Sequence, residues 1–322
     1  MNSSESAAML QAIQAARTFE GATAPNPCVG AVGLTQNGDV LGVAAHEGAG
    51  KPHAEAALIA ALTSQGLMNQ LHTMVVTLEP CNHEGRTPSC VRALIDAHKN
   101  SALKRIVFGS RDPNPRVEGG GAQILTSEGL KVEQAETPEV RDLNAPFVRL
   151  MTRGLPWITV KSALRDSDNR IPPVGQKTFT QPSSLRLAHE LRRRSDAIIT
   201  GSGTVMADSP LFTVRHLPDH AWRAQPRILA VLDRRRRVSS QWIAQARANG
   251  FDVWCPAEPT LPQLFKLIGQ KGALRVLVEA GDLLTQSVLE CGLWSEHVVI
   301  HHFSQEQGKE QREDEIHVYR NH

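Results

Sequence analysis

The chain has 322 residues, of which 41% are hydrophobic and 21% are charged, and its formal net charge is +2. This length is typical of two domains, and the composition excludes a disordered or collagen-like chain. The near balance of charge gives no support for nucleic-acid binding, and no apolar run approaches the length of a membrane span. The N-terminal segment lacks the features of a secretory signal, and the five cysteines follow no disulfide framework. We therefore expect a protein of the reducing cytoplasm.

Hydrophobic residues of the first half alternate between helical and strand spacing. Residues 6–17 predict a helix, and four short β-rich runs follow at 28–34, 40–44, 74–78 and 105–108. Residues 53–62 predict a helix that starts directly after Pro52, a position where proline is tolerated. We expect a closing helix and linker over 137–154. The pattern is that of an α/β domain with a core sheet and covering helices.

A second α/β series begins near residue 156. Strands are predicted at 157–164, 196–201, 227–233, 251–255 and 274–281, and helices at 183–194 and 283–290. We place the boundary near Thr152, so the predicted domains are residues 1–152 and 153–322. The last twenty residues are polar and aperiodic, and we expect them to lack regular structure.

The two halves differ in charge. Residues 1–152 carry 12 basic and 15 acidic side chains, and the remainder carries 23 basic and 18 acidic ones. A basic second half favours a phosphorylated ligand. The arginine runs at 192–194 and 234–237 are also compatible with solvated faces, so the charge alone leaves both interpretations open.

Four residues of the first half have the types and spacing of a metal site. His53 and Glu55 lie in PHAEA, and Cys81 and Cys90 lie in EPCNHEGRTPSC. One imidazole and two thiolates form a set that zinc accepts, with the fourth tetrahedral position left for water. Zinc lowers the pKa of that water toward ~7, so hydroxide is available at neutral pH. Cys90 precedes a helical segment, and helix N-termini stabilise thiolates.

Glu55 lies two residues beyond His53 on the same predicted helical turn, where it can move a proton without binding the metal. H-x-E followed by P-C…C is the signature of zinc nucleobase deaminases, in which hydroxide displaces ammonia from a ring carbon. The alternative is a structural zinc site, which needs a fourth protein ligand, and His83 is the candidate. Both half-motifs are intact and in order, which favours the catalytic site.

Eight residues separate the two cysteines, whereas other zinc deaminases of tRNA or cytidine keep a short spacing. This long loop restricts the zinc-deaminase families that the chain can resemble. The chain resembles the bifunctional deaminase/reductases of riboflavin biosynthesis. The resembling segments of the first half are PNPCVGAV (25–32), HEGAGKPHAE (46–55), TLEPCNHEGRTPSC (77–90) and DPNPRVEGGG (112–121). The resemblance implies an α/β fold with a cytidine-deaminase-like zinc domain and a dihydrofolate-reductase-like second domain. We expect that second domain to be divergent or shortened at its C-terminal end relative to the family pattern.

By this resemblance His53, Cys81 and Cys90 are zinc ligands, and Glu55 is the general acid/base. The substrate-recognition positions of the first domain are Asn26, His46, His83, Asp112 and Asn114. Asn and His side chains suit an aminopyrimidine because they supply donors and acceptors. Asn26 and Asn114 also stand beside prolines, so turn formation is an alternative explanation.

The second half carries four further resembling segments, at 161–171, 191–215, 225–233 and 276–284. They imply NADPH contacts by Ala163, Thr204, Asp208 and the stretch from Gly281. Contacts to the ribosyl phosphate substrate are implied for Arg192, Arg215 and Glu279. Arginine holds phosphate through two parallel hydrogen bonds, although surface solvation is an alternative for both arginines.

The implied enzyme is a hydrolase and oxidoreductase that uses Zn²⁺ and NADPH. It deaminates 2,5-diamino-6-ribosylamino-4(3H)-pyrimidinone 5′-phosphate and then reduces the ribosyl group to ribityl. The expected partner is this small-molecule substrate, with no nucleic acid or membrane, and the resemblance is compatible with a homodimer. Two alternatives stay open: a deaminase with a non-catalytic reductase-like domain, and a deaminase of a different aminopyrimidine.

Overall fold

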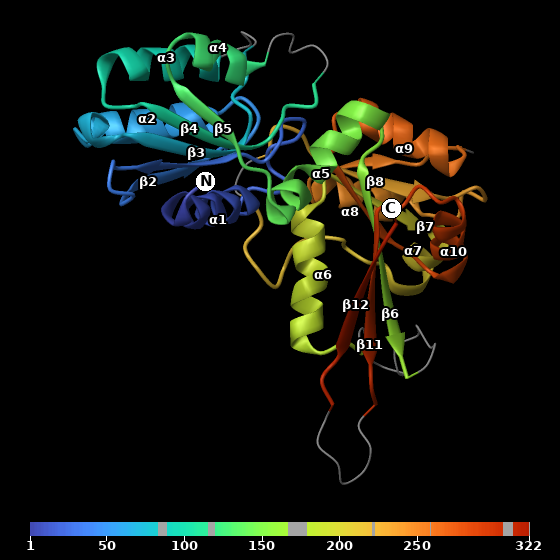
Figure 1. The fold of residues 1–322 in the computed structure, drawn as a ribbon. Helices are drawn as coiled ribbons and strands as arrows, with labels where there is room; N and C mark the ends of the chain where they lie inside the picture. The colour runs from blue at the N-terminus through green and yellow to red at the C-terminus, as the bar shows by residue number, and fades with distance from the viewer. Residues whose placement is uncertain are drawn as a thin grey trace. The chain divides into compact units, whose positions relative to one another are not determined.

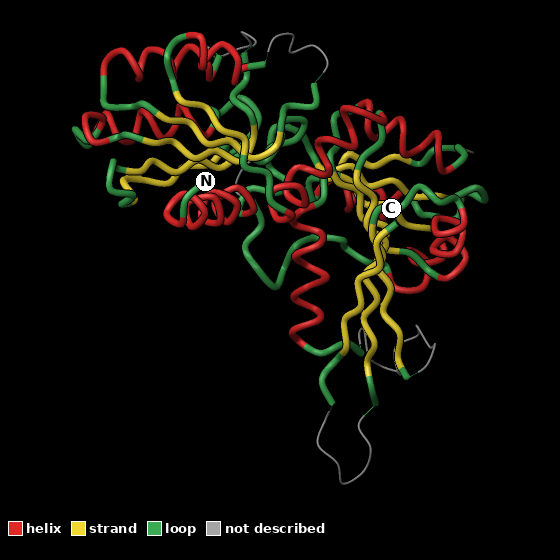
Figure 2. The backbone as a smooth tube through the Cα atoms, viewed as in Figure 1, coloured by secondary structure: helices red, strands yellow, loops and turns green. Residues whose placement is uncertain are grey.

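The computed structural model describes residues 1–82, 89–114, 120–166, 179–220, 223–257, 259–304 and 312–321. The chain divides into two compact units, Met1–Arg153 and a second that begins at Gly154 (Figure 1). Each unit contains one β-sheet with helices against it (Figure 2). No helix of the described residues is long and apolar enough to cross a membrane.

The first unit has a five-stranded sheet in the order β2-β1-β3-β4-β5. Its strands are β1 (Gly30–Leu34), β2 (Val40–Ala45), β3 (Thr73–Leu78), β4 (Arg105–Ser110) and β5 (Lys131–Gln134). β1 pairs antiparallel with β2 and β3, whereas β3, β4 and β5 are parallel. All six residues of β3 are buried, as expected for a central strand covered on both faces.

Five helices cover this sheet: α1 (Ser3–Arg17), α2 (Ala54–Ser64), α3 (Cys90–Asn100), α4 (Gly121–Ser127) and α5 (Pro138–Arg153). A 3₁₀ turn, η1 (Met68–Gln70), precedes β3. Apolar residues of α1 and α5 pack with Val32, Val75 and Val107 on one face. Helices α2, α3 and α4 lie on the opposite face (Figure 1). A capping box between Asn2 and Glu5 begins α1.

The second unit has a seven-stranded sheet in the order β12-β11-β6-β10-β7-β8-β9. Its strands are β6 (Trp157–Arg165), β7 (Ala197–Gly201), β8 (Arg227–Leu232), β9 (Phe251–Trp254), β10 (Arg275–Glu279), β11 (Glu296–His302) and β12 (Glu315–Arg320). β6 to β11 pair in parallel, and β12 pairs antiparallel with β11. The carboxyl ends of the six parallel strands therefore lie along one edge of the sheet.

The helices of this unit are α6 (Pro182–Arg194), α7 (Ser202–Asp208), α8 (Ser240–Ala248), α9 (Leu261–Gln270) and α10 (Asp282–Glu290). Successive residues of β7 point to opposite faces of the sheet. Ile198 packs with α6 and α8 on one face, and Ile199 packs with α9 and α10 on the other. Both faces of the parallel sheet are thus covered, which explains the nearly continuous apolar runs of its strands.

The expectation that the last twenty residues lack regular structure is wrong for Glu315–Arg320. This segment forms β12, with six residue pairs from Glu296↔Arg320 to His301↔Glu315. All six of its residues are exposed, so no alternation of buried and exposed positions marks the strand in the sequence. Backbone pairing with β11, rather than burial of side chains, holds the segment.

Gly30 lies at a close approach between α1 and the sheet. A Cβ atom at this position would lie 1.9 Å from the carbonyl oxygen of Ala12, a contact that only backbone movement can relieve. We predict that Gly30→Ala lowers the free energy of unfolding of the first unit by roughly 3 kcal/mol, as overpacking does. Urea unfolding followed by circular dichroism measures this change.

Gly203→Ala is the matched control, because a Cβ atom at Gly203 meets nothing within 4 Å. It lies inside a helix, so alanine should leave stability unchanged or raise it slightly. Equal stability of the Gly30→Ala variant and the unaltered chain would show that α1 does not approach the sheet so closely.

Candidate functional site

The first unit brings His53, Cys81 and Cys90 together, and their ligand atoms all lie within 4.8 Å of one another. His53 is the residue that precedes α2, Cys81 follows β3, and Cys90 is the first residue of α3. The His53 Nδ1 atom lies 3.3 Å from Cys90 Sγ and 3.5 Å from Cys81 Sγ. A buried strand and the starts of two helices therefore fix the three side chains.

Local hydrogen bonds hold the two cysteines in register. The backbone N–H of Val91 donates to the carbonyl oxygen of Cys81 at 3.2 Å, and the N–H of Cys90 donates to Cys81 Sγ at 3.5 Å. Ser89 caps α3 by accepting a hydrogen bond from the N–H of Arg92 at 3.3 Å. These contacts set the direction in which Cys90 enters the cluster.

The donor set and its spacing fit zinc. For tetrahedral zinc, typical bond lengths place an imidazole nitrogen and a thiolate sulfur roughly 3.6 Å apart. The two observed nitrogen–sulfur distances, 3.3 and 3.5 Å, are close to this edge length. Among the described residues, no other group of three such side chains converges in this way. Three protein ligands leave one tetrahedral position for a small molecule.

Hydrogen bonds within the cluster shift the pKa values of its three side chains. The hydrogen bond from the Cys90 thiol lowers the pKa of Cys81 to about 4, and the same contact raises the pKa of Cys90. The hydrogen bond with Cys81 raises the pKa of His53. The lowered pKa of Cys81 favours its thiolate form without a metal, and a bound cation would also favour the thiolate form of Cys90.

Glu55 lies in the first turn of α2 with only 3% of its surface exposed. Burial raises the pKa of this carboxyl group, and the nearby charge of Cys81 raises it further. A carboxyl group whose pKa is shifted toward neutrality can both take up and release a proton at physiological pH. Its position beside the three donors suits proton transfer at a group held by them.

Two of the predicted substrate positions lie beside the cluster. His46 is buried, and its ring contacts that of His53 with 5.2 Å between ring centroids. Its Nδ1 atom lies 2.9 Å from the carbonyl oxygen of Pro52, so Nδ1 carries the proton. Its Nε2 atom is therefore the acceptor for the Asn26 side-chain amide, at 3.2 Å. Burial lowers the pKa of His46, which favours this neutral form.

Asp112 and Asn114 lie on the loop after β4, where Glu79 organises the backbone. One carboxylate oxygen of Glu79 accepts a hydrogen bond from the N–H of Asp112 at 3.4 Å, and the other accepts one from Ala122 at 3.1 Å. Asp112 in turn accepts a hydrogen bond from the N–H of Asn114 at 2.9 Å. Glu79 lies within the TLEPC segment but was not among the predicted site residues. His83 lies outside the described residues.

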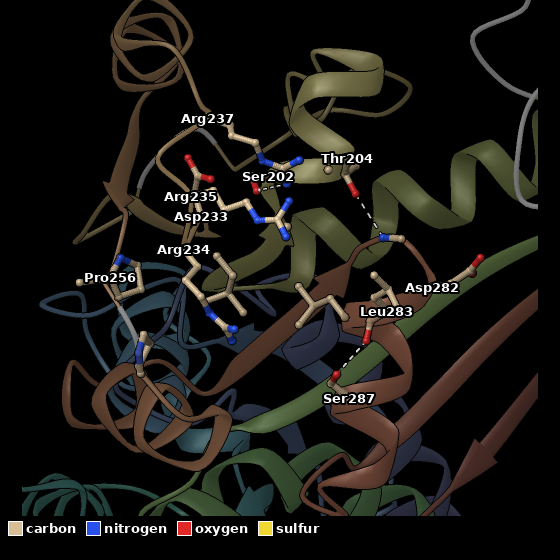
Figure 3. Close-up of a pocket in the computed structure, with 17 residues that line it drawn as sticks. Ser202, Thr204, Asp233, Arg234, Arg235, Arg237, Pro256, Asp282, Leu283 and Ser287 are labelled. Carbon is tan, nitrogen blue, oxygen red and sulfur yellow. Dashed lines mark hydrogen bonds between the residues drawn. The ribbon is translucent and has the colours of Figure 1, made fainter.

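The second unit contains a cavity of about 630 Å³ at the carboxyl ends of its parallel strands (Figure 3). Its lining includes Thr204 and Gly281, and the Thr204 hydroxyl accepts a hydrogen bond from the N–H of Gly281 at 3.1 Å. The lining among the described residues does not include Ala163 or Asp208. Carboxyl ends of parallel strands are the usual place for a dinucleotide in an open α/β sheet.

One side of the cavity is basic, and it is formed by the arginine run at 234–237. Arg234, Arg235 and Arg237 line it from the turn after β8, and Thr204, Asp282 and Leu283 face them from α7 and α10 (Figure 3). Arg237 donates a hydrogen bond to the Ser202 hydroxyl at 2.9 Å. Three of the four arginines in this run therefore border a cavity, whereas the sequence alone was equally compatible with a solvated face.

Arg192 and Glu279 form a two-point ion pair. Arg192 Nε and Nη2 donate to the two carboxylate oxygens of Glu279 at 2.7 and 3.1 Å. Burial tends to raise the pKa of Glu279, but the charges of Arg192 and Lys161 outweigh it and hold that pKa below its usual range. Glu279 therefore occupies two of the donors that a phosphate would need on Arg192.

Arg215 belongs to the same cluster through His189. Its backbone N–H donates to His189 Nδ1 at 3.0 Å, and its guanidinium donates to the Thr213 hydroxyl at 3.0 Å. Burial and the charge of Arg192 lower the pKa of His189 to about 4, so this imidazole is neutral. The fold thus brings together the three residues predicted to contact the ribosyl phosphate, and adds His189 to them.

Comparisons with known proteins find matches for both halves of the chain. Residues 2–110 match the cytidine and deoxycytidylate deaminase zinc-binding region, and residues 169–303 match the RibD C-terminal domain. The riboflavin biosynthesis protein RibD of Aquifex aeolicus is 39% identical over 213 residues, which are 65% of this chain and 57% of that protein. The RibD protein of Escherichia coli is 33% identical over an alignment of 322 residues, and the alignment covers 90% of this chain and 85% of that protein.

A solved structure from Thermotoga maritima, described as a diaminohydroxyphosphoribosylaminopyrimidine deaminase/5-amino-6-(5-phosphoribosylamino)uracil reductase, superposes with a TM-score of 0.80. It is 26% identical, and the match covers 96% of this chain and 89% of that one. The predicted two-domain α/β fold is therefore confirmed. On this identity and coverage, the chain belongs to the RibD family of riboflavin biosynthesis proteins.

Proposed function

We propose that the first unit deaminates 2,5-diamino-6-ribosylamino-4(3H)-pyrimidinone 5′-phosphate and that the second unit then reduces the ribosyl group to ribityl with NADPH. The observation that carries the deaminase proposal is the convergence of His53, Cys81 and Cys90 beside the buried Glu55. The deaminase and reductase activities named for the Thermotoga maritima neighbour support the assignment. The predicted residues 1–152 and 153–322 are our proposed limits for the two catalytic domains.

In this proposal His53, Cys81 and Cys90 hold zinc. Zinc held there would act as a Lewis acid and lower the pKa of a bound water. Glu55 accepts the proton of the attacking water and returns protons to the ring nitrogen and to the departing amine. Its burial suits this role, because the raised pKa lets the carboxyl group work in both directions.

Hydrogen-bonding side chains next to the cluster would orient the pyrimidine ring. His46 is held by the Pro52 carbonyl and accepts a hydrogen bond from the Asn26 amide through Nε2. The Asn26 side chain can still offer its carbonyl oxygen and its second amide hydrogen to the ring. Asp112, Asn114 and His83 stay predictions for the remainder of the substrate.

For the reductase, we place NADPH in the cavity against Thr204 and Gly281. NADPH bound there would supply the hydride for C1′ of the opened ribose. Arg192, Arg215 and Glu279 would contact the substrate, in which case the phosphate competes with Glu279 for Arg192. Cofactor contacts by Ala163 and Asp208, a homodimer and a cytoplasmic location stay predictions from the sequence.

Replacement of Glu55 tests the proton-transfer role. Glu55→Gln should keep zinc and lose ~10²–10⁴-fold in ammonia release, because the amide cannot move the proton. Ammonia release and zinc content are measured on the same sample. Glu128→Gln, which alters an exposed carboxylate paired with Lys99, should keep full activity. Full activity of the Glu55 variant would contradict the assigned role.

Replacement of Cys81 tests the ligand set. Cys81→Ser should lose both zinc and deaminase activity, because a hydroxyl group is a poor ligand for zinc compared with a thiolate. Elemental analysis after dialysis against a weak chelator gives the zinc content. The exposed Cys255 provides the control, and Cys255→Ser should keep its zinc. One zinc per chain in the Cys81 variant would show that this thiol is not a ligand.

A further inference from the structure

The imidazole of His189 contacts both Arg192 and Arg215 in the second unit. We propose that His189 is a positioning residue, which holds the backbone of Arg215 against α6 so that the guanidinium groups of Arg192 and Arg215 both face the phosphate of the substrate. This inference rests on the proposed reductase function. It assigns a role to a buried side chain that the hydride-transfer chemistry does not use.

One hydrogen bond joins α6 to the segment that follows α7. The backbone N–H of Arg215 donates to His189 Nδ1 at 3.0 Å, although 26 positions separate the two residues in the sequence. Arg192 lies three residues after His189 on α6, so the two side chains share one face of that helix. The contact that fixes the Arg215 backbone to His189 therefore also fixes its distance from Arg192.

The same segment packs against α6 before it reaches Arg215. The ring of Phe212 is buried and its centroid lies 6.0 Å from the guanidinium carbon of Arg192. Arg192 Nη1 lies 3.5 Å from the carbonyl oxygen of Thr213, which is a long contact for a hydrogen bond. The shorter hydrogen bond to His189 extends this packing as far as the backbone of Arg215.

His189 is neutral, and its tautomer follows from its partner. Burial and the charge of Arg192 lower the pKa of His189 to about 4. Because Nδ1 accepts a hydrogen bond, the ring proton is on Nε2. Nε2 lies 3.5 Å from Arg192 Nη1, and since both nitrogens carry hydrogens this contact is not a hydrogen bond. Glu279 therefore sets the orientation of Arg192, whereas His189 sets the position of Arg215.

The charges of this cluster suit an anion. Glu279 pairs with Arg192, whereas Arg215 forms no ion pair with a carboxylate in the described part of the chain. Burial and the charge of Arg192 lower the pKa of Arg215, as expected for two guanidinium groups that lie near each other. Each of them can donate parallel hydrogen bonds to phosphate oxygens. His189 is 0% exposed and Arg215 is exposed, so His189 acts through Arg215 and does not itself touch the substrate.

Two amide variants separate the acceptor from the polarity of the side chain. The side-chain oxygen of asparagine can take the place of histidine Nδ1, whereas the longer glutamine carries its amide to the place of Nε2. His189→Asn should therefore keep the hydrogen bond from Arg215, and His189→Gln should lose it. Arg186→Gln, at an exposed position of the same helix, is the control.

The measurement is NADPH oxidation by the full-length zinc-loaded protein, with 5-amino-6-(5-phosphoribosylamino)uracil as the substrate. It gives KM and kcat for each variant, for Arg215→Gln and for the double variant His189→Gln/Arg215→Gln. The dephosphorylated substrate, supplied well below its KM, is the probe that lacks the anion.

We expect His189→Gln to raise KM for the phosphorylated substrate roughly 5–30-fold and to keep kcat within about threefold, because phosphate binding contributes equally to the ground and transition states. His189→Asn and the control should keep KM within about threefold of the unaltered chain. Arg215→Gln should raise KM, and adding His189→Gln to it should raise KM no further, since the positioned group is already absent. Turnover of the dephosphorylated substrate should not change in His189→Gln by more than about twofold.

A merely structural role of His189 gives a different pattern. A partly unfolded variant lowers kcat at an unchanged KM, because only the folded fraction turns over. Circular dichroism and ammonia release by the first unit report the folding of each variant. If His189→Gln does not fold, His189→Leu takes its place, because leucine fills the buried position and also lacks the acceptor.

The outcomes separate this inference from the reductase proposal. If the unaltered chain reduces the substrate and the Gln and Asn variants have equal KM values, the acceptor has no role while the reductase proposal stands. Full additivity of His189→Gln and Arg215→Gln, or an equal loss with the dephosphorylated substrate, would also overturn the inference. If the unaltered chain oxidises no NADPH with this substrate, the reductase proposal itself fails, and the inference fails with it.

Discussion

The contact among His53, Cys81 and Cys90 is the constraint on which the chemistry of the first unit depends. It requires that β3 end beside the starts of α2 and α3, and the complete burial of β3 fixes that end. The positive ends of two helix dipoles then lie near a cluster that carries negative charge on its thiolates. The same α2 start that places His53 also places Glu55, so one helix start positions the proposed metal ligand and the proposed proton carrier together.

The second unit depends on parallel pairing in the same way. Because β6 to β11 run in one direction, their carboxyl ends gather the polar residues of the unit at one edge. The end of β10 contributes twice, since Glu279 pairs with Arg192 and Gly281, two residues later, borders the cavity. The buried ion pair and the cavity proposed for the dinucleotide are thus linked by one strand end. This proximity is what hydride transfer between a cofactor and a phosphorylated sugar would require.

The sequence predicted those features that a local pattern encodes. The convergence of His53, Cys81 and Cys90 follows from residue types and spacing, and most strands of both sheets follow from their apolar runs. The strands β5 and β11 and the helices α4, α7, α8 and α9 were not predicted. β12 was missed because its side chains are exposed on both faces and only its backbone pairing defines it.

Glu79 and His189 could not be found from a motif alone, because their roles arise from contacts between distant segments. The run at 234–237 was ambiguous for the same reason: whether an arginine faces solvent or a cavity is decided by the elements opposite it.

The central proposal is that this one chain carries out a deamination and then a reduction. The most direct test supplies the zinc-loaded protein with the diaminopyrimidine ribosyl phosphate, with and without NADPH, and follows ammonia release and NADPH oxidation together. The account predicts ammonia in both cases and, with NADPH present, one NADPH oxidised for each ammonia released. Ammonia release without any NADPH oxidation would leave the second unit without its assigned activity, and no ammonia at all would contradict the central claim.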